Sequence, residues 1–299
     1  MRTQPHRSAF TGVMPQRLAS LLLMLPGLLW LGILMVVPCA IILVTAFYER
    51  GIYGGVDWSV ATFGNFVRAG EWLYLSIFLD SARIAGLAAF FALLVGYPAA
   101  YAISRAAPER QTALLFLAML PFWTNYLIRT YAWIVLLNPS GLANNFLQWL
   151  GLIHSPLPIL YNEFAVILGL VYNYVPFVIL AVYSALQRLD PSYAEASRDL
   201  GATAATTFWR ITLPLTAPGV AAGAVFVFVL SIGNFVTPDL LGGGKLQMVG
   251  NLIYDQFLTA RDWPFGSALS VILIAIMLVL LFAQAVAANR ARGEGKSHA

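Results

Sequence analysis

The chain has 299 residues, of which 60% are hydrophobic and only 10% are charged. Soluble domains carry about 25% charged residues, so this composition excludes a soluble protein and predicts an integral membrane protein. The net charge of +4 does not indicate nucleic-acid binding, because the arginines lie at the ends of apolar runs and not on one face. Cys39 is the only cysteine and the three histidines lack metal-ligand spacing, so we expect neither an internal disulfide nor a metal site.

Six apolar runs are long enough to cross a bilayer, which takes about 20 residues of helix. The first covers residues 18–47 without a charge and exceeds the signal-peptide core of about 7–15 residues, so it predicts a spanning helix. The other five predicted helices lie near residues 84–104, 111–137, 164–186, 211–238 and 266–288. The predicted fold is therefore an all-α integral membrane protein with six transmembrane helices.

Six spans place both termini on the same side, and the basic residues identify that side. Eleven of the 17 Lys and Arg residues lie in the N-terminal arm (1–17), in the second and fourth connections and in the C-terminal tail (289–299). Five lie in the remaining connections, and one, Arg129, lies within a span. By the positive-inside rule we expect both termini, and the fourth connection, to be cytoplasmic.

The fourth connection contains a polar segment, residues 190–214, in an otherwise apolar chain. Asp190 and Pro191 have the pattern of an N-cap followed by proline at the first helical position. Ser192 and Glu195 have capping-box spacing, which would start the same helix two residues later. Gly201 is placed to end this helix in a left-handed conformation.

A second short helix is expected after Gly201. Thr203 or Thr206 can cap it, and it would carry Phe208 and Trp209 and end before Pro214. Two short helices joined at a glycine would form a compact projection outside the membrane. From these residues alone an ordinary interhelical loop is equally compatible with the pattern.

Tests for enzymatic motifs fail. Gly242-Gly243-Gly244-Lys245 suggests a phosphate-binding loop, but Asp239 stands where the motif needs glycine and Leu246 where it needs Ser or Thr. The chain has no zinc-protease helix motif and no nucleophile-elbow motif, and the spans hold no pair of catalytic carboxylates or histidines. We therefore expect a protein that is not itself an enzyme.

Several polar residues lie at membrane depth. Arg129 has a functional and a structural interpretation. In the functional one it lines a solute path beside Asn125 and Tyr126; in the structural one it reaches the outer surface or pairs with Asp80. The remaining ones have two possible roles, contact with a solute or hydrogen bonds between helices; they are Asn173, Tyr174 and Asn234. In the fifth span, Gly219-x-x-x-Gly223 predicts close packing against a neighbouring helix.

The polar segment resembles a motif of a known family. Glu195-Ala196-Ser197, Gly201 and Ile211-Thr212-Leu213-Pro214 have the spacing of the Glu-Ala-Ala-x3-Gly-x9-Ile-x-Leu-Pro loop in permease subunits of binding-protein-dependent ABC importers, with Ser197 in place of the third-position Ala. The resemblance implies the type I importer permease fold, with a loop that docks on a cytoplasmic ATPase. The residues it assigns to this docking are Glu195, Ala196, Gly201, Phe208, Ile211, Leu213 and Pro214.

Two further stretches, 121–133 and 235–243, resemble the first permease of the spermidine/putrescine branch of that family. The resemblance implies an importer core over residues 75–288 and a bacterial inner-membrane location. It also implies three partners: a second homologous permease, an ATPase dimer and an extracytoplasmic binding protein. ATP would be bound by the ATPase dimer, and this chain itself is expected to hold no cofactor. The solute path would then include Asn125, Tyr126, Asn173, Tyr174, Asn234 and Asp239.

Other cargoes and other transport classes remain open at this point. Permeases for ferric iron, opines and phosphonates share much of the pattern. A self-sufficient channel or secondary carrier is the alternative from another class, although such proteins often show inverted repeats or midplane charges, and neither is visible in the sequence.

Overall fold

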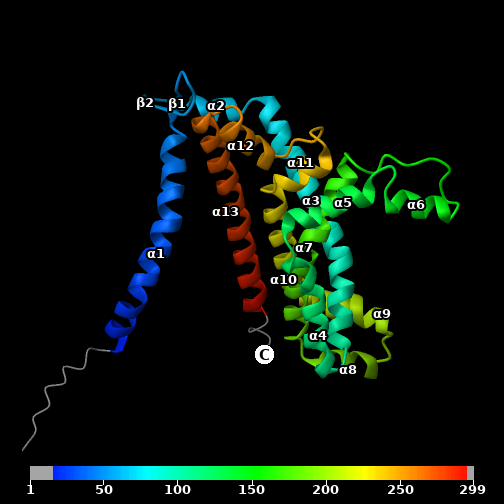
Figure 1. Ribbon diagram of the computed structural model, residues 1–299. Helices are drawn as coiled ribbons and strands as arrows, with labels where there is room; N and C mark the ends of the chain where they lie inside the picture. The colour runs from blue at the N-terminus through cyan, green and yellow to red at the C-terminus, as the bar shows by residue number, and fades with distance from the viewer. Residues whose placement is uncertain (1–15, 295–299) are drawn as a thin grey trace, which may run out of the picture.

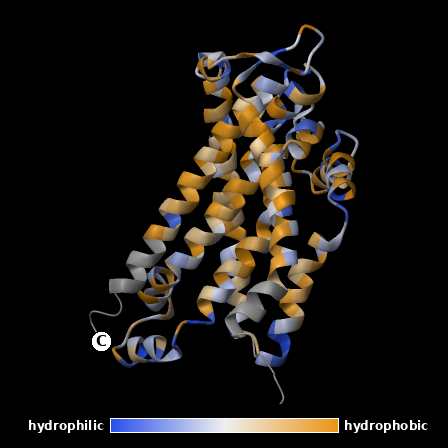
Figure 2. Cartoon of the chain, turned by 90° about the vertical axis from the view of Figure 1, so that its left-hand side faces the viewer, coloured by the Kyte–Doolittle hydropathy of each residue, from blue (hydrophilic) through white to orange (hydrophobic). Residues whose placement is uncertain are grey.

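The computed structural model describes residues 16–294, and residues 1–15 and 295–299 of the predicted arm and tail lie outside it. It is a bundle of long apolar helices with polar ends (Figures 1 and 2). Five helices are long and apolar enough to cross a membrane, or six if one bent pair forms a span. The five long helices are α1 (Gln16–Thr45), α3 (Trp72–Arg105), α7 (Glu163–Leu186), α10 (Leu213–Ile232) and α13 (Trp263–Glu294).

The third predicted span, residues 111–137, is broken rather than continuous. It consists of α4 (Pro108–Met119), a short 3-10 helix η1 (Leu120–Trp123) and α5 (Tyr126–Leu137), and α6 (Leu142–Trp149) follows outside the bundle. The segments Pro108–Trp123 and Tyr126–Trp149, the second of which includes α6, are bent by 85° relative to each other. The break follows Pro121, which cannot donate a backbone hydrogen bond, and Asn125 then starts a new helix by accepting from the amides of Leu127 and Ile128 at 2.8 and 3.3 Å.

The fifth predicted span, residues 211–238, is also interrupted. Helix α10 ends at Ile232, and α11 (Val236–Gly242) and α12 (Val249–Leu258) fold back over the end of the bundle at which α3 begins. A Cβ atom on Gly250 would lie 2.8 Å from backbone atoms of Gly233 and Asn234, so only glycine allows α12 to approach the interruption this closely.

Helices α3, α7 and α10 form the centre of the bundle. One face of α3 carries buried small residues at helical spacing, which lets the backbones approach; they are Ala85, Ala88, Ala92, Gly96 and Ala100. The Gly219 and Gly223 motif of α10 lies against α7, where a Cβ on Gly219 would overlap Ala185. The prediction of close packing by this motif is confirmed.

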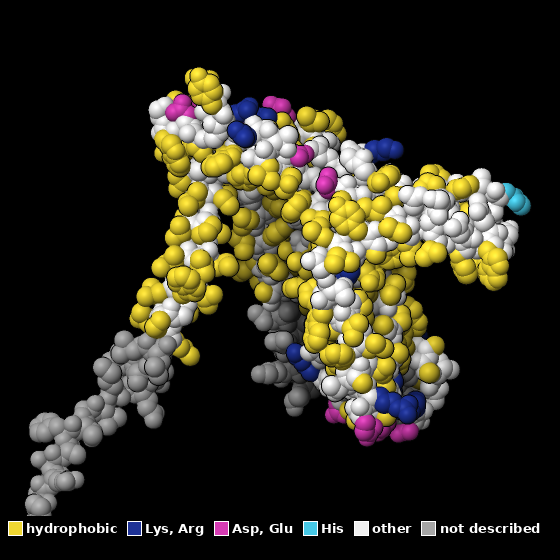
Figure 3. Space-filling model, viewed as in Figure 1, with side chains coloured by type: hydrophobic (Ala, Val, Ile, Leu, Met, Phe, Trp, Pro, Cys, Tyr) yellow, Lys and Arg dark blue, Asp and Glu magenta, His cyan; other side chains and the backbone are white. Residues whose placement is uncertain are grey.

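Helix α1 stands apart from the centre. No residue in the most apolar 18-residue stretch of Met24–Thr45 is buried. Toward its N-terminal end, α1 diverges from α13 (Figures 1 and 3). At its other end the Thr45 hydroxyl donates to the Ser267 hydroxyl of α13 at 2.8 Å. The helix thus presents a long apolar surface that the rest of the described chain leaves uncovered.

A small hairpin that the sequence did not predict follows α1. Strands β1 (Tyr48–Arg50) and β2 (Val56–Ala61) pair antiparallel, and α2 (Gly64–Ala69) joins them to α3. Arg68 of α2 is paired at 2.8 Å with the buried Asp262 just before α13, which fixes α2 to this end of the bundle.

The polar segment lies at the opposite end. It forms α8 (Pro191–Asp199), α9 (Ala204–Thr207) and a π-helical turn η2 (Phe208–Thr212). In Figure 1 these elements lie at the same end as the start of α1 and the end of α13. An even number of spans requires this arrangement; the assignment of that end to the cytoplasm stays a prediction.

Candidate functional site

Helix α8 begins where the first of the two cap patterns places it. The Asp190 carboxylate accepts the Ser192 amide at 2.9 Å, so Pro191 is the first helical residue and the capping-box start is not used. This hydrogen bond from the Ser192 amide lowers the pKa of Asp190 below its ordinary value. The cap is therefore ionised at neutral pH, which also suits the positive end of the helix dipole.

The end of α8 is set by Gly201, as predicted. Its φ of 80° lies in the left-handed region, and the space around it is open. The Gly201 amide donates to the Arg198 carbonyl at 2.9 Å and the Ala202 amide to the Ser197 carbonyl at 3.1 Å. This is the two-bond Schellman arrangement, which turns the chain sharply without leaving carbonyls unpaired.

The second half of the polar segment differs from the prediction. Thr203 does cap α9, accepting the Thr206 amide at 3.2 Å. The helix does not end before Pro214, however, but continues through η2 into α10 as one helical run, Ala204–Ile232. Pro214 lies inside this run, directly after the wider π-turn in which the Leu213 amide donates to the Phe208 carbonyl. The helix therefore continues past a residue that has no amide donor of its own.

Side chains join the two halves of the segment and anchor it to the bundle. The buried hydroxyls of Ser197 and Thr207 lie 2.9 Å apart and hydrogen-bond α8 to α9. The Phe208 ring packs edge-on against Tyr97 and Tyr101 of α3 at 5.6 and 5.5 Å between centroids. Phe208 thus anchors the segment to its own bundle.

The predicted docking residues divide by exposure. Glu195 and Ala196 lie on the exposed face of α8, and Pro214 is exposed at the start of α10. Ile211 and Leu213 are half-buried. Two large apolar side chains that the sequence argument did not select, Leu200 and Trp209, are 89% and 65% exposed on the same projection. Leu200 lies directly before the Gly201 turn, and Trp209 lies within the π-turn. The exposure of these two side chains follows from the local backbone path and cannot be inferred from residue type alone.

A second site lies where the interruptions of the third and fifth spans meet. Asn234 donates from Nδ2 to the hydroxyls of Tyr126 and Tyr174, both at 2.6 Å. Its Oδ1 accepts the Thr237 amide at 2.9 Å, and the Thr237 hydroxyl is hydrogen-bonded to that of Tyr126. These four residues, Tyr126, Tyr174, Asn234 and Thr237, are called the polar cluster below.

The other predicted path residues lie apart from these hydrogen bonds. Asn173 is 1% exposed, and neither its amide nitrogen nor its oxygen has a hydrogen-bond partner within residues 16–294. Asn125 is the cap of α5, and Asp239 is exposed on α11. Thr237 was missed, because its role depends on α11 folding back over the bundle.

Arg129 takes neither of the two structural positions considered from the sequence, the outer surface and a pair with Asp80; its role in a solute path beside Tyr126 stays a prediction. It is 7% exposed, so it does not reach the outer surface. Asp80 lies 3.6 Å from Arg83, which also pairs with Glu163 at 2.8 Å, so the predicted Arg129–Asp80 pair is wrong. The guanidinium carbon of Arg129 instead lies 5.7 Å from the ring centroids of both Phe122 and Tyr126.

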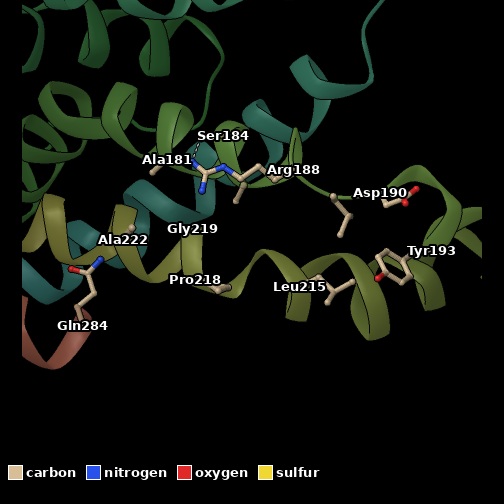
Figure 4. Close-up of a pocket in the computed structure, with 12 residues that line it drawn as sticks. Ala181, Ser184, Arg188, Asp190, Tyr193, Leu215, Pro218, Gly219, Ala222 and Gln284 are labelled. Carbon is tan, nitrogen blue, oxygen red and sulfur yellow. Dashed lines mark hydrogen bonds between the residues drawn. The ribbon is translucent and has the colours of Figure 1, made fainter. Parts of the chain in front are cut away.

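A cavity of ≈ 720 Å³ opens beside the polar segment, between α7 and α10 (Figure 4). Small residues form much of its wall, among them Ala181, Gly219 and Ala222. Arg188 lies in its wall and donates to the Ser184 hydroxyl at 3.1 Å. None of the predicted path residues lines this cavity.

Apolar helices around an internal polar cluster, with a capped polar projection at one end, are features of a multi-pass membrane protein. Comparison with known proteins identifies its class as a permease. Residues 112–293 match the family model described as binding-protein-dependent transport system inner membrane component, so the chain belongs to this family. It is a multi-pass inner-membrane protein.

Curated relatives and solved structures also support the assignment to a transport permease. The chain is 42% identical to the spermidine/putrescine transport system permease protein of Haemophilus influenzae, over 85% of this chain and 88% of the relative. For the Escherichia coli protein of the same name the identity is 41%, over 84% and 91%. A bacterial importer of the polysaccharide alginate has a TM-score of 0.72 at 19% identity, over 92% of this chain and 96% of that one, which shows the type I importer permease fold. The relatives are transport permeases and not enzymes.

Proposed function

We propose that this chain is the permease subunit of an ATP-driven importer for polyamines. The observation that carries the cargo assignment is 41–42% identity over 84–85% of the chain to spermidine/putrescine permeases. The matched region is long enough to include both the polar cluster and the polar segment.

The chemistry of the polar cluster supports a cationic solute. Aromatic ring faces attract ammonium groups, and hydroxyl and amide oxygens accept hydrogen bonds from them. Tyr126, Tyr174 and Asn234 provide both kinds of group, and Asn173 provides an amide without a partner within the described chain. The exposed carboxylate of Asp239 on α11 and the Asn125 amide at the break complete the proposed path.

The polar segment is the proposed docking site for the ATPase. Exposed Glu195 and Ala196 on α8 would contact the partner, while Gly201 fixes the bend and Phe208 holds the projection on α3. ATP would be bound by the ATPase dimer, because this sequence has no complete phosphate-loop motif. Docking in this place requires the polar segment and both termini to be cytoplasmic.

Two further partners follow from uncovered surfaces. The apolar length of α1 is unburied by the described chain, and a second homologous permease and the bilayer would cover it. The hairpin and α12 at the outer end would face the extracytoplasmic binding protein. In support, one solved neighbour of this fold is an alginate transporter in complex with its periplasmic protein.

Coupling is tested on the purified complex in proteoliposomes. Glu195→Lys and Gly201→Asp should assemble but lose most of the ATP hydrolysis that spermidine and its binding protein stimulate. Gly151→Asp is the matched control: it has the same left-handed conformation, with φ of 69°, and open surroundings, but lies outside the polar segment. Normal coupling in both polar-segment variants would contradict the docking assignment.

Cargo is tested separately. The binding protein encoded beside this permease should bind spermidine or putrescine, and the wild-type complex should take up labelled spermidine. Preference for a ferric complex, an opine or a phosphonate would reject polyamines and leave the importer class intact. Uptake by this chain alone, without an ATPase, would instead support a self-sufficient carrier.

A further inference from the structure

Arg129 is a charged side chain buried within the helix bundle. It lies on α5, is 7% exposed, and its guanidinium faces the rings of Phe122 and Tyr126. A charged side chain in such apolar surroundings raises the free energy of membrane insertion unless it is paired or hydrated. A side chain kept there at such a cost is a candidate for function.

The charge of Arg129 is not neutralised within the described chain. Its Nε and Nη1 atoms are buried and have no hydrogen-bond partner in residues 16–294. The described ion pairs are made by Arg68 and Arg83. Asp80 and Glu163, two acidic residues on the central helices α3 and α7, are both engaged by Arg83.

The surroundings of Arg129 would otherwise suit a free cation. Two aromatic rings lie within 6 Å of its guanidinium carbon, and Tyr126 belongs to the polar cluster. A third ring, Phe177, packs on Phe122 at 4.9 Å and continues the aromatic wall toward Tyr174. Arg129 therefore places a tethered cation where the proposed path would attract a mobile one.

We propose that Arg129 is a charge barrier that closes the path to protons and small inorganic cations in the conformation observed. The proposal rests on the proposed function, in which this cluster lines a path for a cation. Like charges a few ångströms apart in partly shielded surroundings oppose each other enough to change a population about a hundredfold. Entry of a cation then requires Arg129 to move, which confines passage to the transport cycle.

A purely structural role makes a different prediction. If a carboxylate of the second permease paired with Arg129, removing the charge would leave that carboxylate buried and would weaken assembly. For an unneutralised charge, a neutral side chain of similar length should leave assembly and thermal stability unchanged or improved. Arg129→Gln and Arg129→Lys separate the two, because lysine keeps the charge but loses the planar hydrogen-bonding geometry.

The test uses the assembled importer in proteoliposomes without ATP. Under an imposed potential, proton leak is followed with a pH-sensitive dye and potassium leak with a potassium-sensitive dye. We expect Arg129→Gln to raise the leak about tenfold or more over wild type, and Arg129→Lys to keep it low. Arg83→Gln is the matched control: it removes an arginine already paired with Glu163, and the leak should stay at the wild-type level.

The outcomes are decisive in both directions. An assembled Arg129→Gln complex with wild-type leak would overturn the barrier, as would equal leak in Arg129→Lys and Arg129→Gln. Loss of assembly in Arg129→Gln but not in Arg129→Lys would overturn it in favour of structural pairing. Failure of wild-type spermidine uptake would reject the cargo assignment, and the leak comparison does not depend on that result.

Discussion

At the scale of single residues, one amide side chain organises the polar cluster. Asn234 donates to two tyrosine hydroxyls from different helices and accepts the Thr237 amide. It lies in the interruption after α10, so it connects α5, α7 and α11 at once. Inside a low-dielectric environment, such a network is stable when all of its members are paired and costly when one is removed.

Replacing Asn234 by alanine should therefore destabilise the fold. The Thr237 amide would lose its buried acceptor and both tyrosines their donor, at a cost of about 1–3 kcal/mol. Thermal unfolding of the detergent-purified complex, followed by tryptophan fluorescence, measures this. The exposed Asn145, whose side chain donates to the Ser140 carbonyl at 3.2 Å, is the matched control. A melting temperature for Asn234→Ala equal to that of Asn145→Ala would contradict the organising role.

The sequence predicts the members of this cluster better than their contacts. Tyr126, Tyr174 and Asn234 stand out because polar groups are rare in apolar spans. The partner of Arg129 was predicted wrongly, because Asp80 is taken by Arg83, which itself reaches Glu163 on another helix. Which acidic residue pairs with which arginine depends on how the helices pack. Hydropathy and sequence spacing do not give that packing.

At the scale of elements, the crossing of α7 and α10 depends on the absence of side chains. A Cβ on Gly219 would overlap Ala185 and lie 3.1 Å from the Ala181 carbonyl oxygen. By contrast, a Cβ on Gly86 of α3 would meet nothing within 4 Å. The two glycines therefore make a matched pair for the same substitution.

We expect opposite effects from alanine at these positions. Gly219→Ala should push α10 away from α7 and destabilise the protein by about 1–3 kcal/mol. Gly86→Ala should leave stability unchanged or raise it by about 0.5–1 kcal/mol, because alanine is the better helix former. Melting temperatures of the purified variants give the comparison. Equal shifts would mean that the crossing can relax and that close contact is not what holds these helices together.

Helix ends are more predictable than helix interruptions. Asp190 and Gly201 set the ends of α8 because capping chemistry acts within a few residues and is visible in the sequence. The break near Pro121 was not predicted, since the residues before it (Phe122, Trp123) and after it (Leu127, Ile128) are all apolar. The outer hairpin was missed because its strands are only three and six residues long, in a segment rich in glycine and aromatics.

At the scale of the whole molecule, α1 is the element that the described chain leaves least covered. It carries the only cysteine, Cys39, which is exposed. If the second permease covers α1, assembly should lower the chemical reactivity of Cys39. This natural cysteine can therefore be used to detect assembly without introducing a labelling site.

Cys39 should react several-fold more slowly with a membrane-permeant maleimide when the second permease is coexpressed than when this chain is expressed alone. Labelling rates in isolated membranes, read by mass shift, provide the measurement, and Cys39→Ser gives the background. The same rate in both membranes would show that α1 faces lipid in the complex. The proposed second-permease contact would then have to lie on another helix.

The long apolar helices and the family were predictable from the sequence at this scale. Apolar runs and the Glu195–Gly201–Pro214 spacing suffice for both, because span length is set by the bilayer and the docking motif is local. The departure of α1 from the bundle was not predictable, because the sequence of an apolar helix is the same whether the helix packs against protein or against lipid.

The continuity of Ala204–Ile232 has a mechanical consequence. With about 1.5 Å of rise per residue, this run is about 43 Å of continuous helix, from the projecting end to the interruption at Gly233 and Asn234. The π-turn, Pro214 and Pro218 lie within the run without ending it. A displacement imposed at α9 is therefore passed along a single helix to Asn234, where it acts on the hydrogen bonds to the two tyrosine hydroxyls.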